Sequence, residues 1–130
     1  MRYVLLAEDN SGDVMLFREA LRTSTIGADL VVAYDGEQAL RLLASQRFDL
    51  VILDLNLPKT DGHAILEKFA KLEGSPPIVV FTSSSNPSDR ERALAAGAKE
   101  YIVKPSEFDE FVQAVQGILE RRSDPYTSGR

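Results

Sequence analysis

The sequence contains no cysteine, which excludes a disulfide framework and a thiolate metal site. No apolar run approaches the roughly 18 residues that a membrane span needs. The stretch before Glu8 is also too short for a secretory signal. Basic residues are few, with 15 Lys and Arg against 20 Asp and Glu. DNA and anionic membranes both favour clustered basic residues, so neither is an expected partner. These absences predict a cytoplasmic protein that binds other proteins.

A chain of 130 residues, of which 44% are hydrophobic, is the size of one compact domain. We expect this domain to span residues 1–122. The last segment, "SDPYTSGR" (residues 123–130), is polar and contains Pro and Gly, which predicts a loose tail. No output domain is expected to follow it.

Short apolar runs alternate with segments of helical period along the chain. The predicted strands are residues 2–7, 30–34, 49–55, 78–82 and 100–104, and the predicted helices are residues 13–24, 36–45, 62–72, 87–96 and 107–121. Four of the strands are apolar at almost every position, which is typical of parallel strands covered on both faces. The pattern predicts an α/β fold, a doubly wound five-stranded parallel sheet of order 2-1-3-4-5 with five helices.

In such a sheet, ligands bind outside the carboxyl ends of the strands at the topological switch point, here strands one and three. Glu8 and Asp9 follow the first predicted strand, and Asp54 lies at the end of the third. Taken singly, each acid is best explained as a solvated loop residue. A cluster of three repels itself unless a hard cation offsets the charge, and Mg²⁺ prefers oxygen ligands. Thr82 and Lys104 end the fourth and fifth strands, which favours a functional site.

An aspartate beside Mg²⁺ can attack phosphorus and form an acyl phosphate. The ammonium of Lys104 would offset the charge on the phosphoryl oxygens, and the hydroxyl of Thr82 could bond to the new group. Taken alone, Lys104 is a surface lysine before a turn and Thr82 a β-branched strand residue.

The strings "AEDN", "LVILDLNLPKTDG", "VVFTSSS" and "YIVKP" occur in this order, each at a predicted strand end. Together they resemble the receiver domain of two-component response regulators, over about residues 2–121. The resemblance implies a flavodoxin-like fold and a Mg²⁺-dependent transfer of a phosphoryl group from a sensor histidine kinase to Asp54. The phosphorylated domain would then signal through a conformational switch.

Carried over by position, the resemblance makes Asp9 the main metal ligand, together with Asp54. Asn56 would give its backbone carbonyl, and Glu8, which stands where aspartate is more usual, would act through metal-bound water. Lys104 would pair with the phosphoryl oxygens.

Thr82 and Tyr101 resemble the family's switch pair, in which the hydroxyl moves to the phosphoryl group and the aromatic ring turns inward. Pro58 and Gly62 would shape the loop after the phosphoacceptor. Pro105 stands where the family usually has a cis peptide bond, which can aim the preceding lysine.

Four further strings, "EDNSGDVMLFREAL", "TSTI", "DLNLPKTDG" and "VQGILE", look closest to the small stand-alone regulators of bacterial phytochromes. The resemblance implies a phytochrome-like sensor kinase and a downstream protein target. It also implies self-association, strengthened by phosphorylation, through the fourth helix, fifth strand and fifth helix. Phe111 and Val115 could lie on that surface or in the core.

Two other functions compete with the switch. A haloacid dehalogenase-type phosphatase also uses an aspartate, Mg²⁺, a threonine and a lysine, but it needs an acid two positions after the nucleophile, where this chain has Asn56. A flavodoxin-like cofactor binder needs a phosphate cradle, whereas the loop "EDNSGD" is acidic. We therefore expect no enzyme beyond self-phosphotransfer and slow self-dephosphorylation.

Two residues receive simpler interpretations. His63, the single histidine, has no histidine or cysteine near it in the sequence and is expected at the surface. Asp13 is expected to favour the positive end of the first helix, with capping as the simpler account and any metal role secondary.

Overall fold

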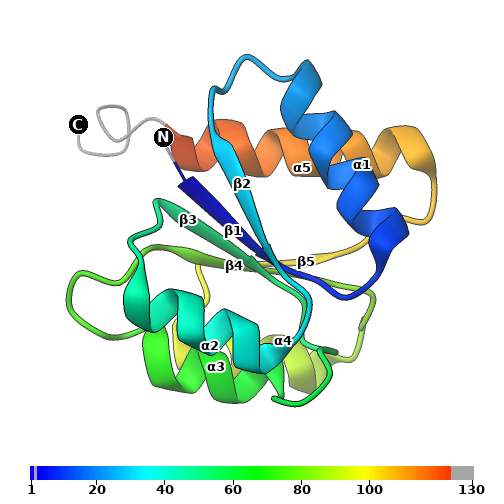
Figure 1. Ribbon diagram of the computed structural model, residues 1–130. Coiled ribbons are helices and arrows are strands. Elements are labelled where there is room, and N and C mark those ends of the chain that lie inside the picture. The colour runs from blue at the N-terminus through cyan, green and yellow to red at the C-terminus, as the bar shows by residue number, and fades with distance from the viewer. Residues whose placement is uncertain (2, 124–130) are drawn as a thin grey trace.

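The computed structural model describes residue 1 and residues 3–123, and in them strands and helices alternate five times (Figure 1). The elements are β1 (Tyr3–Ala7), α1 (Ser11–Thr23), β2 (Asp29–Ala33), α2 (Gly36–Ser45), β3 (Leu50–Leu53), α3 (Gly62–Phe69), β4 (Ile78–Thr82), α4 (Pro87–Ala96), β5 (Glu100–Val103) and α5 (Phe108–Ser123). None of the helices in these residues is long and apolar enough to cross a membrane.

The five strands form one parallel sheet of order β2-β1-β3-β4-β5, which confirms the predicted fold. Ala7, the last residue of β1, is in register with Ala33 of β2 and Leu53 of β3. The residues that follow β1 and β3 therefore emerge side by side at the carboxyl edge. This register brings together groups that are 46 positions apart in the chain.

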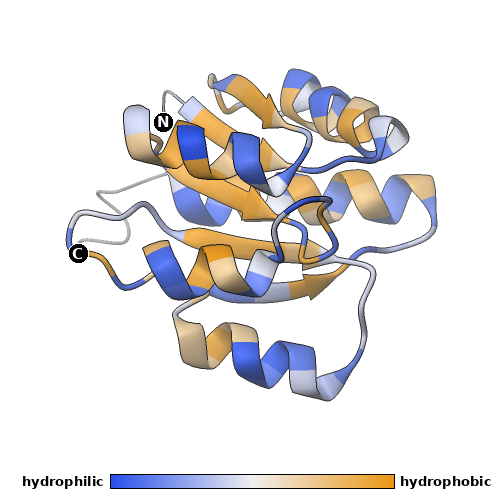
Figure 2. Ribbon diagram, turned by 60° about the horizontal axis from the view of Figure 1, so that its bottom comes forward, coloured by the Kyte–Doolittle hydropathy of each residue, from blue (hydrophilic) through white to orange (hydrophobic). Residues whose placement is uncertain are grey.

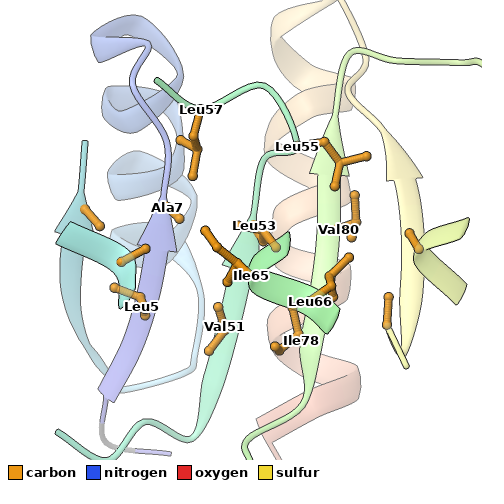
Figure 3. Close-up of a cluster of buried hydrophobic side chains, with 14 of the residues drawn as sticks. Leu5, Ala7, Val51, Leu53, Leu55, Leu57, Ile65, Leu66, Ile78 and Val80 are labelled. Atoms are coloured by element: carbon orange, nitrogen blue, oxygen red, sulfur yellow. The ribbon is translucent and has the colours of Figure 1, made fainter. Parts of the chain in front are cut away.

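Successive strand residues alternate between two hydrophobic layers, because side chains of a strand point to opposite faces of the sheet. Helices α1 and α5 cover one face, and α2, α3 and α4 cover the other (Figure 1). Leu5 and Val51 pack under Ile65 of α3 (Figure 3), whereas Val4 and Leu50 pack with Phe17 of α1. The strands form a largely hydrophobic layer, and the helices carry hydrophilic residues as well (Figure 2).

The first four helices each begin after an Asn or Asp whose side chain accepts a backbone N–H of the first turn. These caps are Asn10, Asp35, Asp61 and Asn86. Such a cap contributes about 1 kcal/mol to stability. The caps follow strand ends closely, so each helix starts near the carboxyl edge of the sheet.

The structure moves several predicted boundaries. Helix α1 begins at Ser11, because Asn10 caps it, and not at residue 13. Helix α3 ends at Phe69, ahead of a turn that contains Gly74 at φ 78°. Ser123 is the last residue of α5, so the predicted tail does not begin there. The rest of that tail, residues 124–130, lies outside the described residues.

Candidate functional site

Three acidic side chains meet at the carboxyl edge of the sheet. Glu8 and Asp9 follow β1, and Asp54 follows β3, with ligand oxygens that all lie within 4.8 Å of one another. Glu8 is only 2% exposed and Asp54 only 5%, whereas Asp9 is exposed to solvent. All three ligands are oxygens, which is the donor set that hard divalent cations prefer. The predicted residues thus fit a cation site.

Lys104 follows β5 and reaches across the edge to this site. Its Nζ lies 2.6 Å from Glu8 Oε1, 2.9 Å from Asp54 Oδ2 and 2.8 Å from Asp13 Oδ2. Its backbone N–H donates to the Thr82 carbonyl at 2.7 Å, which fixes the start of the side chain beside β4. We call Lys104 with its three carboxylate partners the Lys104 cluster.

Asp13 was not predicted in this cluster. It lies in the first turn of α1, as expected, but Asn10 provides the cap and the Asp13 carboxylate bonds to Lys104. The place of Asp13 in the first turn is confirmed, but the expectation that it caps the helix was wrong, because Asn10 is the cap. The Asp13 carboxylate instead reaches Lys104 after β5. The only signal in the sequence was a third acid within a few residues of Glu8 and Asp9.

Burial and charge shift the ionisation of this cluster. Burial raises the pKa of Glu8 to about 7, although Lys104 pulls it down, and nearby Asp54 adds to the rise. Burial alone would lower the pKa of Lys104, but Asp13, Glu8 and Asp54 together raise it above its usual value. Lys104 is thus a permanent cation, yet its carboxylate partners outnumber it three to one. The site has a surplus of negative charge.

The loop after Asp54 is held close to the sheet. The Asn56 N–H donates to Asp54 Oδ1 at 3.1 Å, and the Asp54 N–H donates to the Ala7 carbonyl at 3.1 Å. The Pro58 carbonyl accepts the Gly36 N–H at 3.0 Å. A Cβ on Gly62 would lie 2.6 Å from the Cα of residue 55 and 2.9 Å from the Asp54 carbonyl oxygen, so only glycine fits there. The loop-shaping role of Pro58 and Gly62 stays a prediction.

Thr82 and Tyr101 meet at one backbone segment. Thr82, at the end of β4, is fully buried, and its Oγ1 accepts the Ser84 N–H at 3.4 Å. The Tyr101 ring on β5 is 9% exposed, and its hydroxyl donates to the Ser84 carbonyl at 2.8 Å. The predicted switch pair therefore shares Ser84 as a partner. The Tyr101 ring already points inward.

Two expectations were wrong. The peptide bond before Pro105 is trans, the isomer that is lower in free energy by about 0.5–1 kcal/mol, and Lys104 reaches all three carboxylates with it. His63 is buried, at 5% exposure, and its Nε2 lies 3.0 Å from Asp89 Oδ1. Gly62 lets the start of α3 lie close to the backbone after β3. His63, the next residue, is therefore buried.

In the comparison with protein families, the response regulator receiver domain matches residues 4–116. Among curated proteins, the transcriptional regulatory protein PrrA of Mycobacterium tuberculosis is 34% identical over 96% of this chain and 53% of its own length. The response regulator Rcp1 of Synechocystis sp. is 35% identical over 90% of this chain and 86% of its own length. The chain spans about half the length of the first curated relatives that it matches.

Solved structures give the same result. The phosphorylated cyanobacterial phytochrome response regulator RcpA is 33% identical, with a TM-score of 0.88 over 94% of each chain. The Mn²⁺-bound form of Rcp1 is also 33% identical, with a TM-score of 0.86 over 92% of this chain and 93% of that one. Both likenesses extend over nearly the whole chain.

Proposed function

This chain belongs to the response regulator receiver family, and from that premise we propose that it is a phosphorylation-dependent switch whose acceptor is Asp54. The observation that carries the proposal is the place of this carboxylate. It is almost buried, its Oδ2 lies 2.9 Å from Lys104 Nζ, and its neighbours are further acids at the open edge of the sheet.

The proposed reaction transfers a phosphoryl group from a histidine nitrogen to a carboxylate oxygen. A carboxylate oxygen of Asp54 attacks the phosphorus of a phosphohistidine on a sensor kinase, and the P–N bond breaks with its electron pair left on the imidazole. Lys104 then exchanges a carboxylate contact for a phosphoryl oxygen. As a compact ammonium on a flexible stem, it can change partner without a fixed angular geometry.

The acidic cluster is the proposed Mg²⁺ site. Asp9, Asp54 and the Asn56 backbone carbonyl would hold the ion, and Glu8 would contact it through water. When bound, Mg²⁺ supplies positive charge that offsets the phosphoryl oxygens. The relative Rcp1 has a Mn²⁺-bound form, and the surplus of carboxylates over Lys104 supports a divalent cation here.

Thr82 and Tyr101 would report the event to the surface. The Thr82 hydroxyl would bond to the phosphoryl group, and Ser84, which both residues contact, would move with it. A phosphoryl group that binds better in one arrangement shifts the population toward that arrangement.

The proposed partners follow from the neighbour RcpA, which is a phytochrome response regulator. The kinase would be a sensor histidine kinase of phytochrome type, and the output would be a protein target in the cytoplasm. Leu94 of α4, Val103 of β5 and Phe108 of α5 are exposed and suit a dimer surface. Phe111 and Val115 are buried in the core and do not belong to it.

Family membership gives no support to the phosphatase alternative, and Asn56 stands where a phosphatase of that type needs an acid. To test the acceptor, the protein is incubated with acetyl phosphate and Mg²⁺, and its intact mass is measured beside Asp54→Asn. One acid-labile phosphoryl adduct is expected on the parent, none on the variant and none when EDTA removes the metal. An equal adduct on Asp54→Asn would refute the proposal, and rapid turnover of phosphomonoesters would favour the phosphatase.

A further inference from the structure

A second polar chain lies at the same edge of the sheet, outside the Lys104 cluster. The Ser84 hydroxyl, in the loop between β4 and α4, donates to Asp89 Oδ2 at 2.6 Å. Asp89 lies in the first turn of α4, and its other oxygen, Oδ1, lies 3.0 Å from Nε2 of His63 in the first turn of α3. We call these three residues the Ser84–Asp89–His63 chain.

Each contact in this chain fixes the next. One carboxylate accepts from both neighbours, so the proton between His63 and Asp89 is on Nε2, and the Ser84 hydroxyl points at α4. The hydroxyl of Ser84 and then His63 hold the pKa of Asp89 below its usual range, so the carboxylate stays charged. His63 Nδ1 is buried and has no partner among the described residues. The imidazole is thus anchored through Nε2 alone.

Ser84 connects this chain to the switch pair. Its N–H donates to Thr82 Oγ1 at 3.4 Å, and its carbonyl accepts the Tyr101 hydroxyl at 2.8 Å. The same residue is therefore held by its side chain toward α4, by its carbonyl toward β5 and by its N–H toward β4. All these contacts are between atoms of the protein itself. Holding the Tyr101 ring inward therefore requires no phosphoryl group.

We infer that the Ser84–Asp89–His63 chain is a clamp that holds the loop between β4 and α4 in the arrangement that buries Tyr101. His63 and Asp89 are then positioning residues, which act through Ser84. The inference that these contacts keep the Tyr101 ring buried does not depend on the proposed function. The consequence for signalling does rest on the proposed function. A switch whose ring is already inward needs less bias from a phosphoryl group to favour that arrangement.

A simpler explanation is that these residues only dock α4 on α3. The structure offers a matched control, because Arg92 of α4 and Glu67 of α3 form an ion pair at 3.2 Å that joins the same two helices. Among the described residues, no hydrogen bond or ion pair joins this pair to Ser84, and the charge of Arg92 is only the weakest of the causes that lower the pKa of Asp89. If the residues only dock α4 on α3, loss of the Ser84–Asp89–His63 chain and loss of the Arg92–Glu67 pair should affect Tyr101 equally. If they form a clamp, only loss of the Ser84–Asp89–His63 chain should expose the Tyr101 ring.

The test is fluorine NMR of the full chain labelled with 3-fluorotyrosine, without acetyl phosphate or metal. Tyr101→Phe assigns the resonance among the four tyrosines, and a soluble paramagnetic probe reports how exposed the ring is. We expect a protected Tyr101 resonance in the parent. Asp89→Ala and Ser84→Ala should raise its accessibility at least tenfold, whereas Arg92→Ala should leave it unchanged.

His63 gives a further pair of variants. His63→Leu should expose the ring, and His63→Gln, which keeps an N–H donor, should restore most of the protection. Ser84→Ala removes only one hydroxyl and should fold, so the test does not depend on the larger changes. An unchanged Tyr101 signal in Ser84→Ala, an exposed ring in the parent, or equal effects of Arg92→Ala and Asp89→Ala would each overturn the clamp. These signals do not depend on whether Asp54 accepts a phosphoryl group.

Discussion

Two polar groups of residues at one edge of the sheet differ in how their charge is balanced. In the Lys104 cluster, three carboxylates share one ammonium, and Asp9 adds a fourth acid beside them. In the Ser84–Asp89–His63 chain, one carboxylate accepts from two donors. The first group keeps a surplus of negative charge. In the second group, as far as the structure describes the chain, only the buried His63 Nδ1 lacks a hydrogen-bond partner.

This difference in charge balance suits the Lys104 cluster to a chemical role and the Ser84–Asp89–His63 chain to a structural one. A cluster with surplus negative charge is stabilised by a bound cation. Such a site therefore favours a metal ion and a reaction in which charge moves. A chain with balanced donors and acceptors gains nothing from a ligand and instead holds backbone segments in place. Metal dependence should therefore distinguish the two groups in every variant.

The largest effect is expected for Lys104→Ala. Removal of the Lys104 ammonium, whose side chain is only 9% exposed, leaves its carboxylate partners facing each other and should cost about 3 kcal/mol of unfolding free energy in EDTA. Mg²⁺ should recover much of this loss, because it replaces the missing positive charge. Urea unfolding with and without Mg²⁺ measures both values, and a loss that Mg²⁺ does not reduce would show that Lys104 acts by packing alone.

Glu8→Gln tests the charge of the Lys104 cluster through the pH dependence of stability. The pKa of Glu8 is about 7 in the folded protein against the usual 4.5, so the folded state keeps a proton that the unfolded chain releases. The stability of the metal-free parent should therefore fall as pH rises from about 4.5 to 7, by roughly 2–3 kcal/mol from this group. In Glu8→Gln this fall should be absent. Urea midpoints in EDTA at pH 5 and pH 8 check it, and equal pH dependence of both proteins would exclude Glu8 as its source.

Asp89→Ala tests the balanced chain. It leaves the Ser84 hydroxyl and the buried His63 without their acceptor, which should cost about 1–2 kcal/mol. Unlike the loss in Lys104→Ala, this one should be the same in EDTA and in Mg²⁺. If Mg²⁺ restored the unfolding free energy lost in Asp89→Ala, the two groups of residues would have to act as one site.

The smallest effect is expected for Arg92→Ala. Arg92 and Glu67 are both about half exposed, and exposed ion pairs contribute about 0–1 kcal/mol. We expect a change below about 0.5 kcal/mol, and none in phosphoryl adduct formation by intact mass. A loss larger than that of Asp89→Ala would mean that the docking of α4 on α3 depends on this pair more than on Asp89.

The fold was predictable because its signals are local and repeated. Near-continuous apolar strands and amphipathic helices alternate, and parallel register then places Glu8 and Asp54 side by side. Asp13 was missed because its contact with Lys104 joins residues 91 positions apart through the packing of α1. His63 was misplaced because its burial depends on how closely Gly62 approaches the backbone, which no hydrophobic pattern records.

In the proposed function, Asp54 alone among the acids of this edge carries the phosphoryl group. The most direct test is to treat the protein with acetyl phosphate and Mg²⁺, reduce the acyl phosphate with borohydride and map the modified residue by tandem mass spectrometry. We predict conversion of Asp54 to homoserine, in samples that contain Mg²⁺ only. Reduction at Glu8, Asp9 or Asp13 with Asp54 intact would contradict the claim.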